Sequence, residues 1–168
     1  SSKRPAVFDD TLHEGFLPCT ENNFVRQGFR FLGDEYGWGG LDDSVDCSSF
    51  VGDVYRSMGI ELPRDADQQV KSMPKVVDLS GMGEADRLAA LEACMPGTLL
   101  ANNTHVMMYL GQDDDGTPIV LQSMSSWFSF GSDYGKHYLR KVIASTATFL
   151  NFSGVPYING VHYLGSLR

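Results

Sequence analysis

The stretch from Tyr36 to Gln69 constrains the fold of this chain more than any other part. It opens with a glycine-rich loop at residues 36–40, and residues without a Cβ allow sharply turned backbone there. Cys47 is followed by apolar residues at intervals of three and four, which predict one face of an amphipathic helix: Phe50, Val51, Val54, Tyr55 and Met58. Gly59 stands where a helix C-cap glycine is expected. Cys47 is therefore predicted to lie at the helix N-terminus, between Asp46 and Ser48.

A cysteine at a helix N-terminus is well placed for nucleophilic chemistry. The thiolate is the nucleophile, and the positive end of the helix dipole lowers the pKa of the thiol. The alternative is an ordinary core cysteine, because free cysteine is among the most frequently buried residue types. The local pattern leaves both interpretations of Cys47 open.

Length and charge narrow the class of protein. The chain has 168 residues, enough for one domain with a core of its own. Its net charge of -8 argues against nucleic acid or an anionic membrane surface as the main partner. No apolar run approaches the roughly 18 residues of a membrane span. We therefore expect a globular domain with another kind of partner.

The three cysteines predict no structural metal site. Cys19, Cys47 and Cys94 show no CxxC spacing, and no histidine lies at zinc-finger distance from them. If Cys47 is a nucleophile, Cys19 and Cys94 either pair in an oxidising compartment or stay reduced and buried. The reduced and buried state is favoured.

The order of the predicted elements indicates an α+β fold. Residues 1–20 are interpreted as an irregular lead-in segment, and residues 21–168 as one domain. Thr20 is expected to cap a helix that ends at Gly33. From Pro96 onward the pattern changes from helical to strand-like, which predicts N-terminal helices packed on a mainly antiparallel sheet. Further helices are expected at 47–58, 65–70 and 84–95, and strands at 98–101, 105–110, 119–123, 138–149 and 160–164.

His105 and Gln122 are the residues that best complement a nucleophilic cysteine. Such a cysteine needs a base, and the base needs a third polar group to orient it. His105 opens an apolar strand after a polar turn, although a strand histidine without a function is the commoner case. The turn at 113–116 predicts a hairpin that brings Gln122 near His105. A solvent-facing polar residue is the alternative for Gln122.

Four motifs occur in order along the chain and together resemble the NlpC-type family of bacterial cell-wall cysteine peptidases, which have a papain-like fold. The resemblance covers roughly residues 24–123. The motifs are Tyr-x-Trp-Gly-Gly at 36–40, Asp-Cys-Ser at 46–48, Gly-Ile-x-Leu-Pro-Arg at 59–64 and His-Val-x-x-Tyr-Leu-Gly at 105–111.

The resemblance implies a cysteine endopeptidase that hydrolyses peptidoglycan stem peptides, commonly between γ-D-glutamate and a diamino acid. Cys47 would be the nucleophile, His105 the general base, and Gln122 the third residue, a position that is often histidine in relatives. In relatives that require a free amino terminus on the stem peptide, the Asp and Ser beside the nucleophile bind that amine. These residues are Asp46 and Ser48 here, and a helix N-cap is the alternative role of Asp46.

The resemblance also implies further substrate-binding residues. Tyr36 and Trp38 would line the cleft, with Tyr36 a candidate donor to the oxyanion, and Arg64 would bind substrate. Loop packing is the alternative for both aromatic residues. Two positions depart from the family pattern: Ser49 replaces the usual glycine, and Ala66 replaces a frequent serine, which leaves substrate preference open.

Peptidoglycan or a muropeptide is the expected partner, and no metal or organic cofactor is expected. The cell envelope or the outside of the cell is favoured over the cytoplasm as its location. Relatives often carry an upstream SH3-like domain, which is not evident in this sequence and would belong to a longer chain. Two alternatives remain: an amidase or acyltransferase of the same fold, and a wall-binding module without activity. The intact Cys47 and His105 argue against the second.

Overall fold

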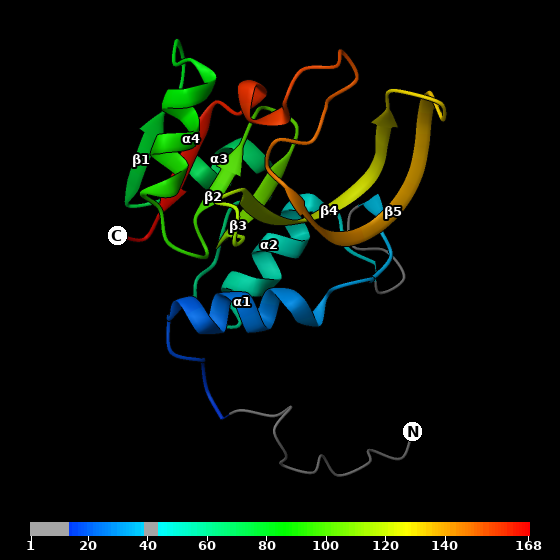
Figure 1. Cartoon of the computed structure of the whole chain (residues 1–168). Coiled ribbons are helices and arrows are strands. Elements are labelled where there is room, and N and C mark those ends of the chain that lie inside the picture. Colours follow the sequence, from blue (N-terminus) through cyan, green and yellow to red (C-terminus); the bar gives the residue numbers. More distant parts are fainter. Residues whose placement is uncertain (1–13, 39–43) are drawn as a thin grey trace, which may run out of the picture.

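The computed structural model describes residues 14–38 and 44–168. The glycine pair at 39–40 and residues 1–13 of the predicted lead-in segment lie outside this part. The described residues form four α-helices and six strands, together with the 3₁₀ helix η2 (Figure 1). In chain order they are α1 (Glu21–Arg30), α2 (Cys47–Arg56), α3 (Ala66–Lys71), β1 (Lys75–Asp78), α4 (Glu84–Glu92), β2 (Leu99–Ala101), β3 (Val106–Gln112), β4 (Pro118–Ser129), β5 (Gly135–Thr146), η2 (Tyr157–Gly160) and β6 (Tyr163–Ser166).

The strands form one antiparallel sheet in the order β1-β6-β2-β3-β4-β5. The predicted α+β fold, with N-terminal helices on an antiparallel sheet, is confirmed. Among the described helices, none is long and apolar enough to cross a membrane.

Side chains of β3 alternate between two cores, one on each face of the sheet. Val106 and Met108 join the core that includes α1, α2 and α3, whereas Met107 and Tyr109 join the core of α4 and η2. All four side chains are buried. This alternation follows from the two-residue period of a strand. It packs α2, which begins at Cys47, directly against β3 and β4.

The N-terminus of α2 is held by a capping box. The Asp46 carboxylate accepts a hydrogen bond from the Ser49 backbone N–H at 2.8 Å, and the Asp46 N–H donates to the Ser49 hydroxyl at 2.8 Å. This arrangement satisfies two backbone donors that a helix start leaves unpaired. The predicted apolar face is buried throughout, so the predicted helix and the position of Cys47 are confirmed.

The first helix departs from its prediction at its C-terminal end. Thr20 caps α1 as expected, by accepting from the Asn23 N–H at 3.3 Å. The helix ends at Arg30, however, and Phe29 and Leu32 are exposed rather than buried. Gly28 makes the closest approach to the sheet instead. A Cβ there would come within 2.7 Å of Met108, so the absence of a side chain sets this contact.

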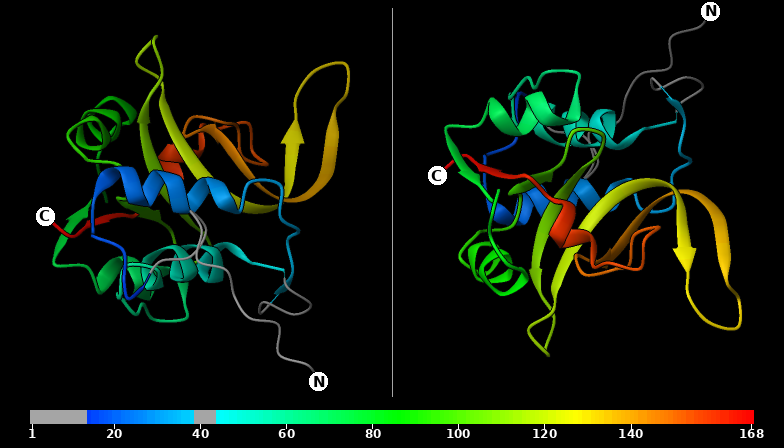
Figure 2. Two further views of the ribbon diagram at one scale, coloured as in Figure 1. Left: turned by 90° about the horizontal axis from the view of Figure 1, so that it is seen from below. Right: turned by 90° about the horizontal axis from the view of Figure 1, so that it is seen from above.

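Two parts of the sheet were not predicted. Strand β1 is a short and mostly exposed edge strand, which carries no period-two signal. Strand β4 continues beyond the predicted 119–123. It pairs with β5 over this added length, whereas β3 pairs with it only as far as Leu121. The distal part of this hairpin, residues 125–140, projects from the body of the protein and is called the arm below (Figure 2). A bulge at Arg140, whose φ is 50°, bends the arm.

Cys19 and Cys94 are both free. Cys94 is half-buried, but Cys19 is exposed, so the prediction that both are buried is wrong for Cys19. The residue lies immediately before the helix cap at Thr20, outside both cores.

Replacing Ser49 by glycine removes the side chain that completes the capping box. We expect Ser49→Gly to lower the free energy of unfolding by about 1 kcal/mol, because the Asp46 N–H loses its acceptor. Chemical denaturation followed by circular dichroism measures this. Ser153→Ala, at an exposed serine outside the helices and strands, is the control and should change stability by less than about 0.5 kcal/mol. Equal stability of both variants would contradict the role given to the box.

Candidate active site

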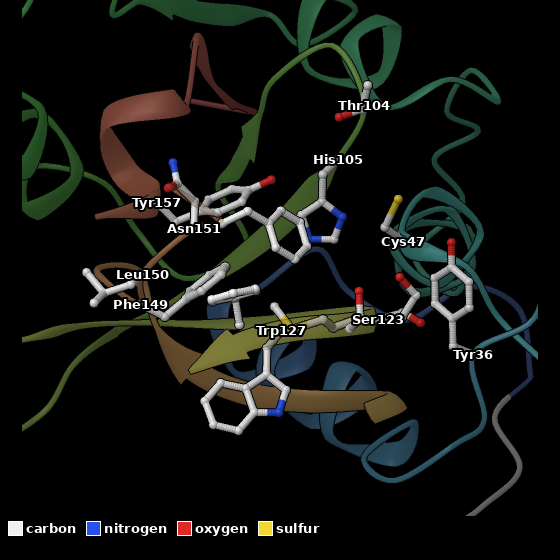
Figure 3. Close-up of a pocket in the computed structure, with 15 residues that line it drawn as sticks. Tyr36, Cys47, Thr104, His105, Ser123, Trp127, Phe149, Leu150, Asn151 and Tyr157 are labelled. Atoms are coloured by element: carbon white, nitrogen blue, oxygen red, sulfur yellow. The ribbon is translucent and has the colours of Figure 1, made fainter. Parts of the chain in front are cut away.

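Cys47 lies at the junction of two hollows on the surface. The first, of about 240 Å³, is also lined by His105, Trp127 and Tyr157. The second, of about 760 Å³, extends along the other side of Cys47. Figure 3 shows the Cys47 side chain beside the ring of His105. The backbone of Val106, the residue after His105, also donates a hydrogen bond to the Cys47 sulfur. The first residue of β3 therefore contacts the thiol.

Burial raises the pKa of the Cys47 thiol above its ordinary value. Hydrogen bonds from the backbone of Val106, Ser48 and Cys47 lower this pKa in part, and the nearby Asp46 carboxylate raises it further. The pKa is raised on balance, so the prediction of a lowered thiol pKa at this helix N-terminus is wrong. Desolvation outweighs the favourable end of the helix, and the resting residue is a neutral thiol.

Gln122 determines which nitrogen of His105 carries the proton. His105 Nε2 lies 2.7 Å from Gln122 Oε1, and Gln122 Nε2 donates to Ser145 Oγ at 2.8 Å. The Ser145 hydroxyl donates to the Thr146 carbonyl at 3.2 Å, so its oxygen is left to accept the amide N–H. Gln122 therefore presents its oxygen to His105. Neutral His105 therefore carries its proton on Nε2, and Nδ1 is the unprotonated nitrogen.

The predicted approach of His105 and Gln122 is confirmed, although they are not directly opposite. The register pairs Met108 with Leu121, which places Gln122 opposite Met107. His105 lies two residues before Met107, and its side chain is on the same face of the sheet. The contact between His105 and Gln122 is therefore diagonal. The long glutamine side chain spans this offset.

Asn102 holds both His105 and its aromatic neighbour. Its Oδ1 accepts from the His105 backbone N–H at 2.9 Å, and its Nδ2 donates to the Tyr157 hydroxyl at 3.0 Å. The Tyr157 ring packs edge-on against the His105 ring, with centroids 5.9 Å apart. This burial lowers the pKa of His105, and the hydrogen bond to Gln122 opposes the shift only in part. The imidazole is therefore neutral at rest.

The second hollow contains a buried carboxylate beside an exposed guanidinium. Asp46 forms an ion pair with Arg64 and accepts from the Ser48 hydroxyl at 3.2 Å. Arg64 also donates to the Ser48 hydroxyl. The Asp46 side chain is 4% exposed and that of Arg64 is 54% exposed, so the guanidinium remains accessible from the hollow while it is paired with Asp46. Ala66, where relatives often carry serine, is part of the lining.

Tyr36 borders both hollows and is positioned by β5. Its N–H donates to the Arg140 carbonyl at 2.8 Å, at the bulge that bends the arm. Burial, followed by the proximity of Cys47 and Asp46, raises the pKa of the Tyr36 phenol. The phenol therefore stays protonated and can donate a hydrogen bond beside the thiol. Trp38 lies at the rim of the second hollow and is 79% exposed.

All eight residues proposed from the sequence lie at or next to these two hollows. Gln122 is fully buried behind His105, and the other seven line the hollows directly: Tyr36, Trp38, Asp46, Cys47, Ser48, Arg64 and His105. Sequence reasoning missed Asn102, Ser145 and Tyr157. Asn102 had a signal, because a turn asparagine before a strand commonly accepts backbone hydrogen bonds. Ser145 and Tyr157 had none, because they reach the site from distant segments. In the described part of the chain, no three His, Cys, Asp or Glu side chains gather as metal ligands.

Comparison with known proteins identifies similar sequences. The sequence profile of the NlpC/P60 family matches residues 33–142. A protein of Bacillus subtilis (strain 168) named gamma-D-glutamyl-L-lysine dipeptidyl-peptidase is 37% identical over 70 residues. The alignment covers 41% of this chain and 23% of that protein, so the chain spans less than a quarter of the relative's length.

Solved structures share the fold. The NlpC/P60 endopeptidase of Photobacterium damselae subsp. piscicida aligns with a TM-score of 0.62 at 21% identity, over 75% of this chain and 32% of that one. RipD of Mycobacterium tuberculosis, described as a non-catalytic NlpC/p60 domain protein adapted to peptidoglycan binding, aligns with a TM-score of 0.55 at 17% identity, over 88% and 97% of the two chains. The predicted papain-like fold is thus confirmed.

The His105 environment predicts its titration. Burial lowers its pKa, so we expect the imidazole to stay neutral down to a pH below the ordinary value of 6.5. In Gln122→Glu a carboxylate faces the ring and favours the imidazolium, so the midpoint should move to higher pH. NMR titration of the His105 ring measures both midpoints. A wild-type midpoint above 6.5, or no upward shift in the variant, would contradict the assigned contacts.

Proposed function

The chain belongs to the NlpC/P60 family, and from this premise we propose that it is a cysteine peptidase that hydrolyses peptidoglycan stem peptides. The catalytic residues are Cys47, His105 and Gln122, and residues 21–168 form the catalytic domain. The observation that carries the proposal is the 2.7 Å hydrogen bond between His105 and Gln122, because it leaves the other ring nitrogen for the thiol.

The reaction begins from a neutral pair. The pKa of Cys47 is raised and that of His105 is lowered, so the proton stays on sulfur until substrate binds. His105 Nδ1 then accepts the thiol proton as Sγ attacks the carbonyl carbon of the scissile amide. A thiolate of high pKa is a strong nucleophile once formed, because nucleophilicity rises with basicity.

Two groups are placed to stabilise the tetrahedral oxyanion. The Tyr36 phenol stays protonated beside the sulfur, and the backbone N–H of Cys47 opens α2. When the intermediate collapses, His105 gives its proton to the leaving amine and a thioester remains on Cys47. His105 then takes a proton from water, whose oxygen attacks the thioester. The carboxylic acid leaves, and His105 gives the proton that it took from water to the sulfur, which restores the thiol.

The second hollow supports a substrate with a free amine and a free carboxylate. The buried Asp46 carboxylate and the Ser48 hydroxyl suit the ammonium of an N-terminal residue. A γ-linked glutamate keeps its α-carboxylate, and the exposed Arg64 guanidinium suits that group. We infer that this hollow binds the two residues before the scissile bond, and that the bond joins γ-D-glutamate to a diamino acid.

A wall-binding module without activity is the second candidate, because a relative of the same fold is described as non-catalytic. The hydrogen-bonded side chains of Gln122 and Ser145 behind His105 favour the enzyme. Gln122 bonds the imidazole and Ser145, and Ser145 in turn donates to the Thr146 carbonyl, so these buried side chains hold the ring in one orientation. An amidase or acyltransferase would use the same residues and is distinguished by its products.

Cleavage of defined peptides tests the activity. We expect release of the diamino acid from L-Ala-γ-D-Glu-diaminopimelate or from the L-Lys analogue, detected by mass spectrometry, with Cys47→Ala as the inactive control. Blocking the amino terminus should reduce kcat/KM by about tenfold or more, because the pair with Asp46 is lost. Intact peptides after long incubation, with intact peptidoglycan also untouched, would favour the binding module.

We expect the loss of activity to be larger for variants of His105, which contacts the reacting atoms in the proposed reaction, than for variants of its partner Gln122. His105→Ala is expected to lower kcat by about 10²–10⁴-fold through loss of the base. Gln122→Ala should lower kcat by about ten- to hundredfold, because the His105 ring is no longer held in place. Gln122→His, the residue that relatives often carry, should recover most of the loss. Equal activity of Gln122→Ala and the wild type would remove glutamine from the catalytic set.

A further inference from the structure

The two hollows at Cys47 divide a bound substrate into two halves. Asp46 and Arg64 line only the second hollow, whereas His105 lines only the first. In the proposed reaction His105 protonates the leaving amine, so the leaving half must extend into the first hollow. The acyl half then occupies the second hollow, near Asp46.

The first hollow runs along the free edge of β4. Six consecutive residues, Ser123–Phe128, line it. Successive residues of a strand point to opposite faces of a sheet, so an unbroken run of lining residues indicates a hollow along the strand edge. Strand β3 pairs with β4 only as far as Leu121, and the same register brings His105 beside Met124. From Ser125 onward, among the described residues, the backbone of 125–128 pairs with β5 alone. This edge therefore keeps unpaired backbone donors and acceptors.

An apolar groove continues from the first hollow onto the arm. This third hollow has a volume of about 630 Å³ and shares Met124, Trp127 and Phe128 with the first. Trp127 is 42% exposed and stacks on His137 with ring centroids 5.0 Å apart, which holds the indole in place. An exposed apolar surface that continues a polar cleft is typical of a binding site.

The charge of this region differs from that of the whole chain. Residues 117–168 contain four Lys or Arg and one acidic residue, Asp133, although the net charge of the chain is -8. Three of the basic residues lie on β5, at Lys136, Arg140 and Lys141. A positive region in an acidic protein favours an occupant with carboxylates. The leaving half of a stem peptide carries them.

We propose that the free edge of β4 and the groove on the arm form an extended subsite for the leaving half of the substrate, a peptide that continues beyond the diamino acid. The peptide lies along residues 125–128 as an added strand, its backbone pairing with the open edge. Its methyl groups and aliphatic chains contact Trp127, and its carboxylates are attracted by the basic strand β5. This inference rests on the proposed function, and it makes peptides with longer leaving halves the better substrates.

The experiment compares two peptides that share the same acyl half. L-Ala-γ-D-Glu-diaminopimelate ends at the leaving residue, and the same peptide with D-Ala-D-Ala attached extends along β4. We expect kcat/KM for the extended peptide to exceed that for the short one by about tenfold, and Trp127→Ala to reduce this ratio to about one. Phe29→Ala, at an aromatic residue of α1 with nearly the same exposure (43%), is the control and should keep the wild-type ratio.

The outcomes separate the subsite from the activity. Cleavage of both peptides with a ratio near one, or a ratio unchanged in Trp127→Ala, overturns the subsite and leaves the peptidase standing. If neither peptide is cleaved, binding of diaminopimelyl-D-Ala-D-Ala to Cys47→Ala is followed by NMR. Shifts of the amides at 125–128 support the subsite, and their absence overturns it. A dimer in sedimentation that Trp127→Ala dissociates would assign the groove to a second copy and also overturn the proposal.

Discussion

The buried carboxylate of Asp46 is the interaction on which the site depends. It caps α2, and the capping box with Ser49 makes Cys47 the first residue of that helix. The same carboxylate binds Arg64 and Ser48, so one group joins the proposed nucleophile to the hollow proposed for the acyl half. The serine that departs from the family's glycine is thus a helix-capping residue here. Loss of this carboxylate would leave the Ser49 backbone N–H and one N–H group of Arg64 without their acceptor.

Strand β4 contributes to the site in three ways along its length. Gln122 orients His105, and the hydroxyl of the next residue, Ser123, donates to the Val45 carbonyl at 2.7 Å, which ties the segment before Cys47 to the sheet. Beyond these, the open edge continues onto the arm. The partner of the proposed base, the tie to the segment before Cys47 and the proposed subsite therefore share one strand. Rigid strands hold such groups more precisely than loops do.

Burial explains the proposed chemistry better than a preformed ion pair does. Desolvation raises the pKa of Cys47 and lowers that of His105, so both groups are neutral in the resting site. The buried donors and acceptors around His105 are satisfied by Asn102 and Gln122, which fix the ring without adding charge. A neutral amide orients an imidazole but stabilises the imidazolium little, in contrast to a carboxylate.

Helix α2, its cap and its buried face followed from the sequence alone, because caps and apolar periodicity involve residues at most a few positions apart. The pairing of His105 with Gln122 also followed, since a short turn connects their strands. Only the tertiary structure placed Ser145 behind Gln122, showed that burial outweighs the helix dipole at Cys47, and revealed the arm. These depend on strand register and desolvation, which arise from contacts between segments distant in sequence.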